Sequence, residues 1–332
     1  MKELIQRLVE TWGPSGYEDQ VRELIRAEVA DAVDEWRVDA LGNLITVKKP
    51  TRQGNGKRVM LAAHMDEIGI MATHVDEKGF VRFTNIGGVH PLNLRGARVQ
   101  FQDGRVGVIG REEKAEGEPT LAQMYIDVGA TSREDCPIKV GDPAVFLRDF
   151  SDLGKRLVAK AFDDRIGCAI LIEVMKRLQE TPHEVIGVFT VQEEVGLRGA
   201  MTSAFGVKPE LALAIDVTMT GDTPEARKRP MQLGKGPAIK VKDRGMLSHP
   251  KVKELLVETA ERLEIPHQLE VLEAGTTDAM SIQVSREGVP TGCVSIPTRY
   301  LHTPSEMVDY DDVLNTVRLI IGFLSGPIDL GQ

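Results

Sequence analysis

Cysteine and aromatic side chains are scarce in this chain, and basic residues are fewer than acidic ones. Its three cysteines, Cys136, Cys168 and Cys293, lie far apart among 332 residues, so we expect reduced packing residues in a reducing compartment rather than a disulfide framework. The formal net charge of −9 disfavours nucleic-acid and anionic-membrane partners, because both need a basic patch. The amino terminus lacks the apolar region of a signal peptide, and no segment approaches the length of a membrane span. Together these absences predict a cytoplasmic protein.

Hydrophobic residues make up 42% of the chain and charged residues 27%, proportions typical of a globular protein that can bury a sizeable core. From residue 157 onward, apolar β-type runs alternate with helical patterns, which predicts a sheet covered by helices on both faces. Residues 68–156 instead carry short β-type runs between glycine-rich turns. The pattern predicts an α/β domain formed by residues 1–67 and 157–332, with a β-rich domain inserted at 68–156.

Local signals near the amino terminus predict individual elements. A helix is predicted from Tyr17 to about Val29, and Ser15 with Glu18 three residues later has the form of a capping box for it. Apolar runs at 43–47 and 58–63 flank a polar turn, which predicts a pair of strands.

Two adjacent carboxylates, Glu193 and Glu194, stand at the end of the apolar run 185–190. That run has the pattern of a buried strand, and two acids at its carboxyl end would repel one another unless a cation lay between them. Taken alone, the pair also fits an exposed loop with two solvated acids.

Polar residues follow the other predicted strands in the same way. The set is His64, Asp163, Glu194, Asp216 and His302. The carboxyl ends of strands form the ligand crevice of an open α/β sheet, so five side chains from five strands can converge there. Two imidazoles and three carboxylates suit zinc, cobalt or manganese, and they can serve two ions if one carboxylate bridges ions about 3.5–4 Å apart.

Each of these residues also has an ordinary structural explanation. Asp163 could be a helix amino-terminal acid that interacts with the helix dipole, and Asp216 could cap a turn. The histidines could be structural or loop residues, although Asp66, two positions after His64, could hold the ring of that histidine. Five such coincidences at equivalent positions are improbable, so the sequence favours a metal centre.

The surrounding motifs extend this interpretation to most of the chain. They are Ser15–Glu18, His64–Gly69, Ile86–Gly88, Asp127–Ala130, Phe162–Gly167, Gln192–Gly196, Asp216–Thr218, Thr277–Ala279 and His302–Glu306. In this order they resemble the tetrahedral (TET) family of dinuclear metalloaminopeptidases, whose members are also called glutamyl or deblocking aminopeptidases or cellulase-like proteins. One departure is Val89, where an aromatic residue is expected.

The resemblance implies a three-layer α/β/α zinc-peptidase-like catalytic domain with an inserted, barrel-like dimerisation domain. It implies that Asp163 bridges two divalent ions, zinc or cobalt first and manganese as an alternative. His64 and Asp216 would then complete one metal site, and Glu194 and His302 the other.

The resemblance also implies an activity, the removal of the N-terminal residue from short peptides. Glu193 would be the general base, Asp66 would orient His64, and the peptide bond between Asp163 and Asp164 would be cis. Dimers would assemble into a hollow twelve-subunit tetrahedron. Glutamyl, lysyl and leucyl preferences all occur in the family, and the sequence does not choose among them.

Two other functions are compatible with the sequence. A metal-dependent hydrolase acting on another amide, such as an acylated amino acid, would use similar ions. A non-catalytic assembly subunit could keep the same scaffold, although the intact Glu193 argues against it. A β-glucanase activity is disfavoured, because glycoside hydrolysis normally uses two separated carboxylates and no metal.

Overall fold

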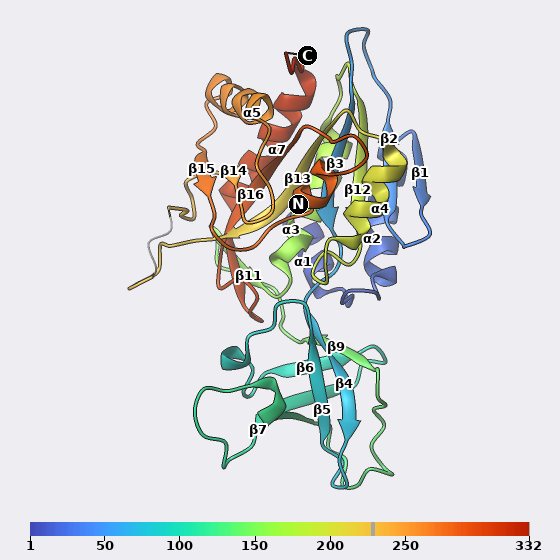
Figure 1. The fold of residues 1–332 in the computed structure, drawn as a ribbon, viewed down its shortest axis with the longest axis vertical. Helices are drawn as coiled ribbons and strands as arrows, with labels where there is room; N and C mark the ends of the chain where they lie inside the picture. The colour runs from blue at the N-terminus through green and yellow to red at the C-terminus, as the bar shows by residue number, and fades with distance from the viewer. Residues whose placement is uncertain (227–229, 332) are drawn as a thin grey trace.

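The computed structural model describes residues 1–226 and 230–331, which form a large α/β part and a smaller β-barrel below it in the view of Figure 1. The large part contains an 11-stranded mixed sheet. Across the sheet the strands are β1 (Glu35–Val38), β2 (Leu44–Lys48), β12 (Glu184–Thr190), β3 (Arg58–His64), β13 (Leu211–Met219), β16 (Thr291–Arg299), β17 (Glu306–Asp309), β11 (Arg156–Ala159) and β10 (Ser151–Asp152). A branch of β14 (Ala238–Lys242) and β15 (Gln268–Val271) joins the sheet through β16.

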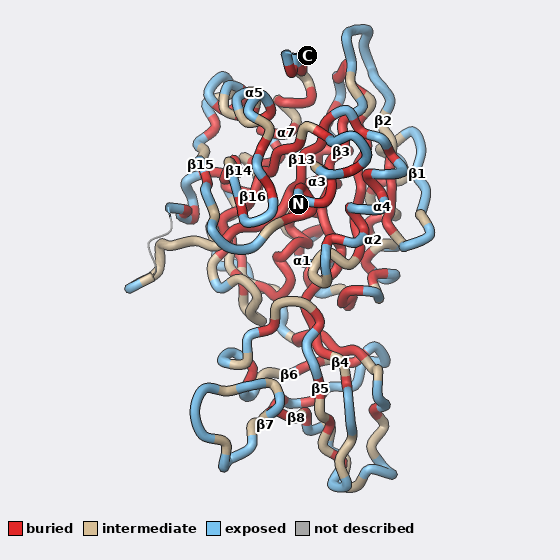
Figure 2. Tube along the Cα trace, in the orientation of Figure 1, coloured by how far each residue is buried: buried red, intermediate tan, exposed pale blue. Residues whose placement is uncertain are grey.

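The central strands are buried on both faces. In β3, Val59 and Leu61 pack into one apolar core, while Met60 and Ala62 pack into another. Side chains of β12 and β13, the two strands that pair with β3 in parallel, alternate between the two faces in the same way. Parallel strands covered on both sides are expected to be apolar throughout, and Figure 2 shows this part of the sheet as continuous red tube.

Helices cover both faces of the sheet. One face is covered by α1 (Lys2–Glu10), α2 (Asp19–Val29), α3 (Phe162–Arg177), α5 (Pro250–Arg262) and α7 (Tyr310–Ser325), and the other by α4 (Arg198–Val207) and α6 (Ala279–Gln283). α3 is buried along most of its length and packs on β3 and β13. No helix in the described part of the chain is long and apolar enough to cross a membrane.

The smaller part is a closed barrel with a core of its own. Its strands, in order around the barrel, are β4 (Gly69–Val75), β5 (Val81–Ile86), β8 (Met124–Asp127), β7 (Val106–Arg111), β6 (Arg98–Phe101) and β9 (Pro143–Phe146). Ile70, Val99, Phe101 and Ile126 are among the side chains that fill it. The predicted fold class, a three-layer α/β/α domain with an inserted barrel, is confirmed. The limits 68 and 156 remain a prediction, and β10, inside them, pairs with the large sheet.

The two strands predicted on either side of the polar turn are present as β2 and β3, although they do not pair with each other, because β12 lies between them and pairs with both. The predicted capping box is absent: Glu18 is itself the N-cap of α2, without a side-chain cap bond. Ser15 instead donates to Oδ2 of Asp66 at 2.6 Å, and Oε1 of Glu18 accepts from the backbone N–H of Gln192 at 3.0 Å. Tertiary contacts therefore take the place of the predicted capping bonds, although Oε1 of Glu18 also accepts locally from the backbone N–H of Gly16 at 2.7 Å.

Candidate metal centre

The five predicted ligand residues lie together at the carboxyl-end edge of the central strands. His64 is the last residue of β3, and Glu194 and His302 follow β12 and β16. Asp163 follows β11 and lies at the beginning of α3. The expectation that all five follow strands is wrong for Asp216, which lies inside β13 because that strand stays paired with β16 beyond it, through Met219 opposite Thr298.

Asp163 lies between the two histidines. Its Oδ1 is 3.0 Å from Nε2 of His64, and its Oδ2 is 3.1 Å from Nε2 of His302. Nε2 of His302 is also 3.5 Å from Oε1 of Glu194. Potential ligand atoms of His64, Asp163 and Glu194 lie within 4.8 Å of one another, and so do those of His64, Glu193 and Asp216.

Asp66 fixes the turn that carries the two glutamates. Its Oδ1 accepts from the backbone N–H of Glu193 at 3.0 Å, and its Oδ2 accepts from that of Glu194 at 3.2 Å. Nδ1 of His64 is 3.0 Å from the main-chain oxygen of Asp66 and 3.4 Å from its Oδ1. Asp66 thus contacts both the predicted base and a predicted ligand.

The beginning of α3 is tied to His64 by the residues after Asp163. The peptide bond between Asp163 and Asp164 is cis, and Oδ2 of Asp164 accepts from the backbone N–H of His64 at 3.2 Å. The fully buried guanidinium of Arg165 donates to the main-chain oxygen of Leu8 at 2.6 Å, at the carboxyl end of α1. A cation suits that end of a helix because its last carbonyls carry partial negative charge. These contacts position α3 against β3 and α1.

The electrostatics of the site favour an added positive charge. Burial raises the pKa of Asp216 to about 8, with Asp163 adding repulsion, and burial raises the pKa of Glu194 to about 7. Burial also raises the pKa of Glu193 well above its usual range. For His302, burial acts to lower the pKa, but the Glu194 and Asp163 carboxylates raise it to about 10. Crowded buried carboxylates favour any cation that can reach them.

Glu306 is a site residue to which sequence reasoning assigned no role. Its Oε2 accepts from the backbone N–H of Asp163 at 3.1 Å, and its Oε1 accepts from that of His302 at 2.9 Å. The side chain is buried, so one carboxylate holds two predicted ligands in register. The motif His302–Glu306 contained the signal, but the spacing alone does not say that the acid bonds backbone rather than metal.

A cavity of about 370 Å³ opens over these residues. Asp163, Glu193, Glu194, Asp216 and His302 line it, and the remaining wall comes largely from the segments 217–219 and 272–277. The barrel also contributes to the wall, through Gly88 after β5. A Cβ at Gly88 would come 2.3 Å from Nδ1 of His302, so a residue without a side chain is required at this contact.

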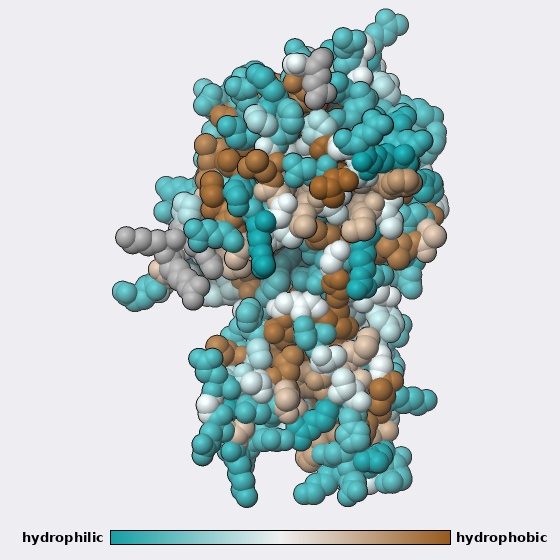
Figure 3. Space-filling model, viewed as in Figure 1, coloured by the Kyte–Doolittle hydropathy of each residue, from teal (hydrophilic) through white to brown (hydrophobic). Residues whose placement is uncertain are grey.

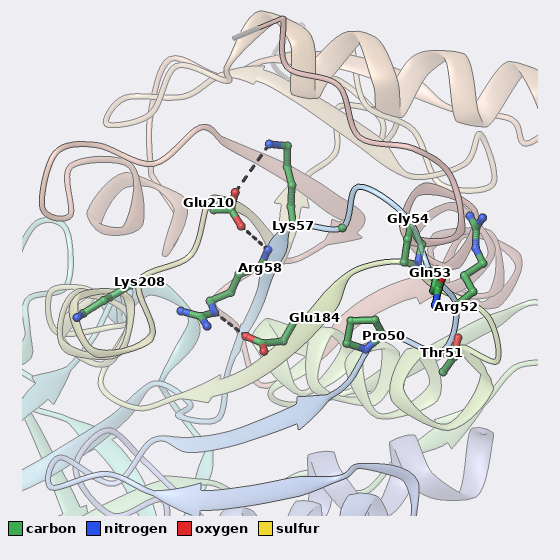
Figure 4. Close-up of a pocket in the computed structure, with 12 residues that line it drawn as sticks. Pro50, Thr51, Arg52, Gln53, Gly54, Lys57, Arg58, Glu184, Lys208 and Glu210 are labelled. Carbon is green, nitrogen blue, oxygen red and sulfur yellow. Dashed lines mark hydrogen bonds and ion pairs between the residues drawn. The ribbon is translucent and has the colours of Figure 1, made fainter.

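A larger hollow, of about 1030 Å³, lies at the opposite edge of the sheet, where β3, β12 and β13 begin. Figure 4 shows four of its charged side chains, Lys57, Arg58, Glu184 and Glu210, joined to one another, whereas no dashed line joins Arg52 or Lys208 to another lining residue. Arg58 pairs with Glu184 at 2.5 Å, and Lys57 lies 3.9 Å from Glu210. The hollow is open and its charged side chains are largely exposed, so water screens them, which makes the hollow a poor candidate for chemistry.

Comparison with known proteins assigns a family to this architecture. The model of the peptidase family described as M42 glutamyl aminopeptidase matches residues 42–319. The chain belongs to the M42 family. The matched span contains the whole barrel and all five residues of the cluster around Asp163.

Relatives of this M42 chain match over nearly their whole length. A protein of Acetivibrio thermocellus, named as an aminopeptidase, is 49% identical over 97% of both chains. The lysyl aminopeptidase of Pyrococcus furiosus is 38% identical over 96% of this chain and 94% of its own.

Solved structures of other proteins are also similar to this chain over nearly its whole length. An aminopeptidase of the archaeon Desulfurococcus kamchatkensis superposes with a TM-score of 0.94 at 43% identity, over 98% of this chain and 94% of its own. The TET1 peptidase of Pyrococcus horikoshii, described as assembling into a tetrahedron or a large octahedral shell, gives a TM-score of 0.86 at 34% identity over 97% and 98%. The predicted resemblance to TET aminopeptidases is confirmed.

Proposed function

We propose that this M42 peptidase is a dinuclear metal-dependent aminopeptidase that removes the N-terminal residue from short peptides. The family membership supports the peptidase activity. The observation that carries the metal centre is the placement of Asp163, whose two oxygens each face a different histidine at 3.0 and 3.1 Å. That is the arrangement a carboxylate needs if it is to bridge two ions.

The residues present fit such a centre. The cluster offers imidazole nitrogens and carboxylate oxygens without a thiolate, a donor set suited to zinc, cobalt or manganese in an open catalytic site. Oε1 of Glu194 is buried and has no hydrogen-bond partner among the described residues, which is unusual for a carboxylate oxygen unless an ion or water completes it. We assign Asp163 as the bridge, His64 and Asp216 to one ion, and Glu194 and His302 to the other.

When bound, two divalent ions would lower the pKa of a shared water and polarise the scissile carbonyl. Glu193 lines the cavity beside this cluster, and we assign it as the general base that takes the proton of the attacking water and returns it to the leaving nitrogen. Asp66 holds the backbone of Glu193 at 3.0 Å and contacts the His64 ring. Its role is therefore to position both groups.

The first test compares substrates with and without a free amine. We expect aminoacyl fluorogenic amides to be hydrolysed, their N-acetylated counterparts to be resistant, and the activity to disappear with a chelator and return with zinc or cobalt. Faster hydrolysis of acylated amino acids would favour the deacylase alternative. Full activity after complete metal removal would contradict the proposal, and a chain that binds no metal would be the non-catalytic subunit.

We also propose that the chain forms a homo-oligomer built from dimers, up to a dodecamer. The TET1 peptidase of Pyrococcus horikoshii can assemble into a tetrahedron or a large octahedral shell, and the solved structure of PhTET1-12s is a dodecamer. On this chain, Leu269 and Val271 of strand β15 are 52% and 58% exposed, and brown atoms gather over the β14–β15 region in Figure 3. Exposed apolar side chains on an edge strand commonly mark a contact surface. A monomeric mass by light scattering would contradict this assembly.

A further inference from the structure

A buried lysine without an assigned catalytic role forms part of the cavity wall. Lys240 lies in β14 opposite Cys293 of β16, and Cys293 in turn lies opposite Ala214 of β13. Side chains alternate along a strand, so Ala214, Asp216 and Thr218 share one face of the sheet, and Lys240 lies on that same face. Its side chain is 1% exposed to solvent, yet it lines the cavity next to the proposed metal centre.

The charge of Lys240 is balanced inside the protein. Its Nζ donates to Oε2 of Glu270 at 2.6 Å, and the Thr218 hydroxyl donates to Oε1 of the same carboxylate. Burial acts to lower the pKa of Lys240, but Glu270, through its charge and its hydrogen bond, together with Cys293 and Asp216, raises it overall. Glu270 is also 1% exposed. The wall therefore carries a dry ion pair with no net charge.

The rest of this side of the cavity is largely apolar. Leu197, Met219, Leu272 and Leu301 line it together with backbone and small side chains of the segment 274–277. A side chain that enters here is removed from water and meets apolar walls and a neutral pair. An extra charge of either sign would be buried without a partner of its own, because each member of the pair is already paired.

We propose that the Lys240–Glu270 pair determines the charge preference of the pocket for the first side chain of the peptide, and that this protein prefers an uncharged first residue such as leucine or methionine. The inference rests on the proposed aminopeptidase function. A glutamyl side chain would compete with Glu270 for Nζ of Lys240 and be repelled by Glu270. A lysyl side chain would be repelled by Lys240. Such unpaired charges are an effective means of excluding competitors.

The test removes one charge at a time. Glu270→Gln leaves the lysine charge unbalanced, so the ratio of kcat/KM for glutamyl over leucyl amides should rise about tenfold or more. Lys240→Met leaves the carboxylate, so the lysyl-to-leucyl ratio should rise by about the same factor. The double variant has neither charge and should again prefer leucyl amides. A purely structural role would reduce the rates for all three substrates together and leave the ratios unchanged.

Two further measurements separate the possible failures. The metal content of each variant shows whether the proposed metal centre is lost, and its melting temperature shows whether the fold is lost. In the wild type, free methionine should inhibit more strongly than free glutamate or lysine, and this arm needs no variant. A wild type that cleaves aminoacyl amides but prefers glutamyl or lysyl ones, or variants whose ratios do not move, would overturn this inference alone. Failure to cleave any aminoacyl amide would overturn the proposed function and the inference with it.

Discussion

The two edges of the central sheet differ in how far their charged side chains are buried. Where β3, β12 and β13 begin, largely exposed charged side chains surround an open hollow, and some of them pair with one another, as Arg58 does with Glu184. At the carboxyl-end edge, Asp163, Glu193 and Glu194 crowd into a cavity of about 370 Å³, against about 1030 Å³ for the hollow. The smaller cavity is the better candidate because burial there raises the pKa values of several crowded carboxyl groups. Burial of charge, rather than cavity size, distinguishes the candidate functional edge.

The largest expected effect is on catalysis at the carboxyl-end edge. Glu193→Gln should lower kcat by about 10²–10⁴-fold, because a general base is removed, while metal content measured by elemental analysis stays at the wild-type value. Glu184→Gln, the same change at the opposite edge, should leave kcat unaltered. A Glu193→Gln protein that keeps both its metal and its full rate would remove Glu193 from the mechanism.

Glu306 offers a smaller test of the same edge. In Glu306→Gln one carboxylate oxygen becomes an NH2 group that faces a backbone N–H of Asp163 or His302, so two donors meet. The loss of an outer partner of two ligands should weaken metal affinity about 10–100-fold, measured by competition with a chromogenic chelator. The exposed Glu287→Gln is the matched control. Equal affinities for the two variants would mean that Glu306 does not position the ligands.

The metal-free protein should lose stability as the pH rises. Burial raises the pKa of Glu194 from 4.5 to about 7 and that of Asp216 from 3.8 to about 8. The folded chain therefore holds protons that the unfolded chain has already released in this range, and its free energy of unfolding falls as the pH rises from about 4 toward 8. In the proposed centre, metal ions would take the place of those protons.

Thermal unfolding at pH 5 and pH 8 measures this difference. We expect the melting temperature of the chelated protein to be lower at pH 8, with a smaller decline for the metal-loaded protein. A chelated protein at least as stable at pH 8 as at pH 5 would show that ionisation of the crowded carboxyl groups does not destabilise the folded chain.

The smallest effect is expected where charges are balanced and exposed. Arg58 and Glu184 are 2.5 Å apart, with side chains 43% and 34% exposed. Breaking such a pair with Arg58→Gln should change the free energy of unfolding by less than about 1 kcal/mol, since solvent screens it. Urea denaturation measures the free energy of unfolding. A loss of several kcal/mol in Arg58→Gln would contradict the view that the charges at this edge contribute little.

Much of the fold was predictable because strands buried on both faces have a simple signature. The apolar runs before His64 and before the glutamate pair correspond to β3 and β12. Their order in the sheet was not predictable from local pattern: β12 enters between β2 and β3, although a polar turn joins the runs at 43–47 and 58–63. Likewise Ser15 bonds Asp66, 51 residues away, rather than the nearby helix terminus.

The candidate site was predictable as a set of residue types, and less so as geometry. The positions of these residues after predicted strands indicated that their side chains converge. The details were not predicted: Asp216 lies inside β13, which continues to Met219, and Asp163 lies at the beginning of α3. Hydrogen bonds from backbone N–H groups to a side chain, such as those that the Glu306 carboxylate accepts, cannot be predicted from the spacing of residues in the sequence. Neither can the pairing of Lys240 with Glu270, because β14 and β15 are brought together by the sheet branch.

The most direct test of the central claim is the number of metal ions bound per chain. Elemental analysis of the zinc- or cobalt-loaded wild type should give two ions per chain, and Asp163→Asn, which weakens the shared ligand, should reduce the value to one or fewer. A wild type that binds one ion or none under saturating metal, or an Asp163→Asn variant that still binds two, would contradict a dinuclear centre bridged by Asp163.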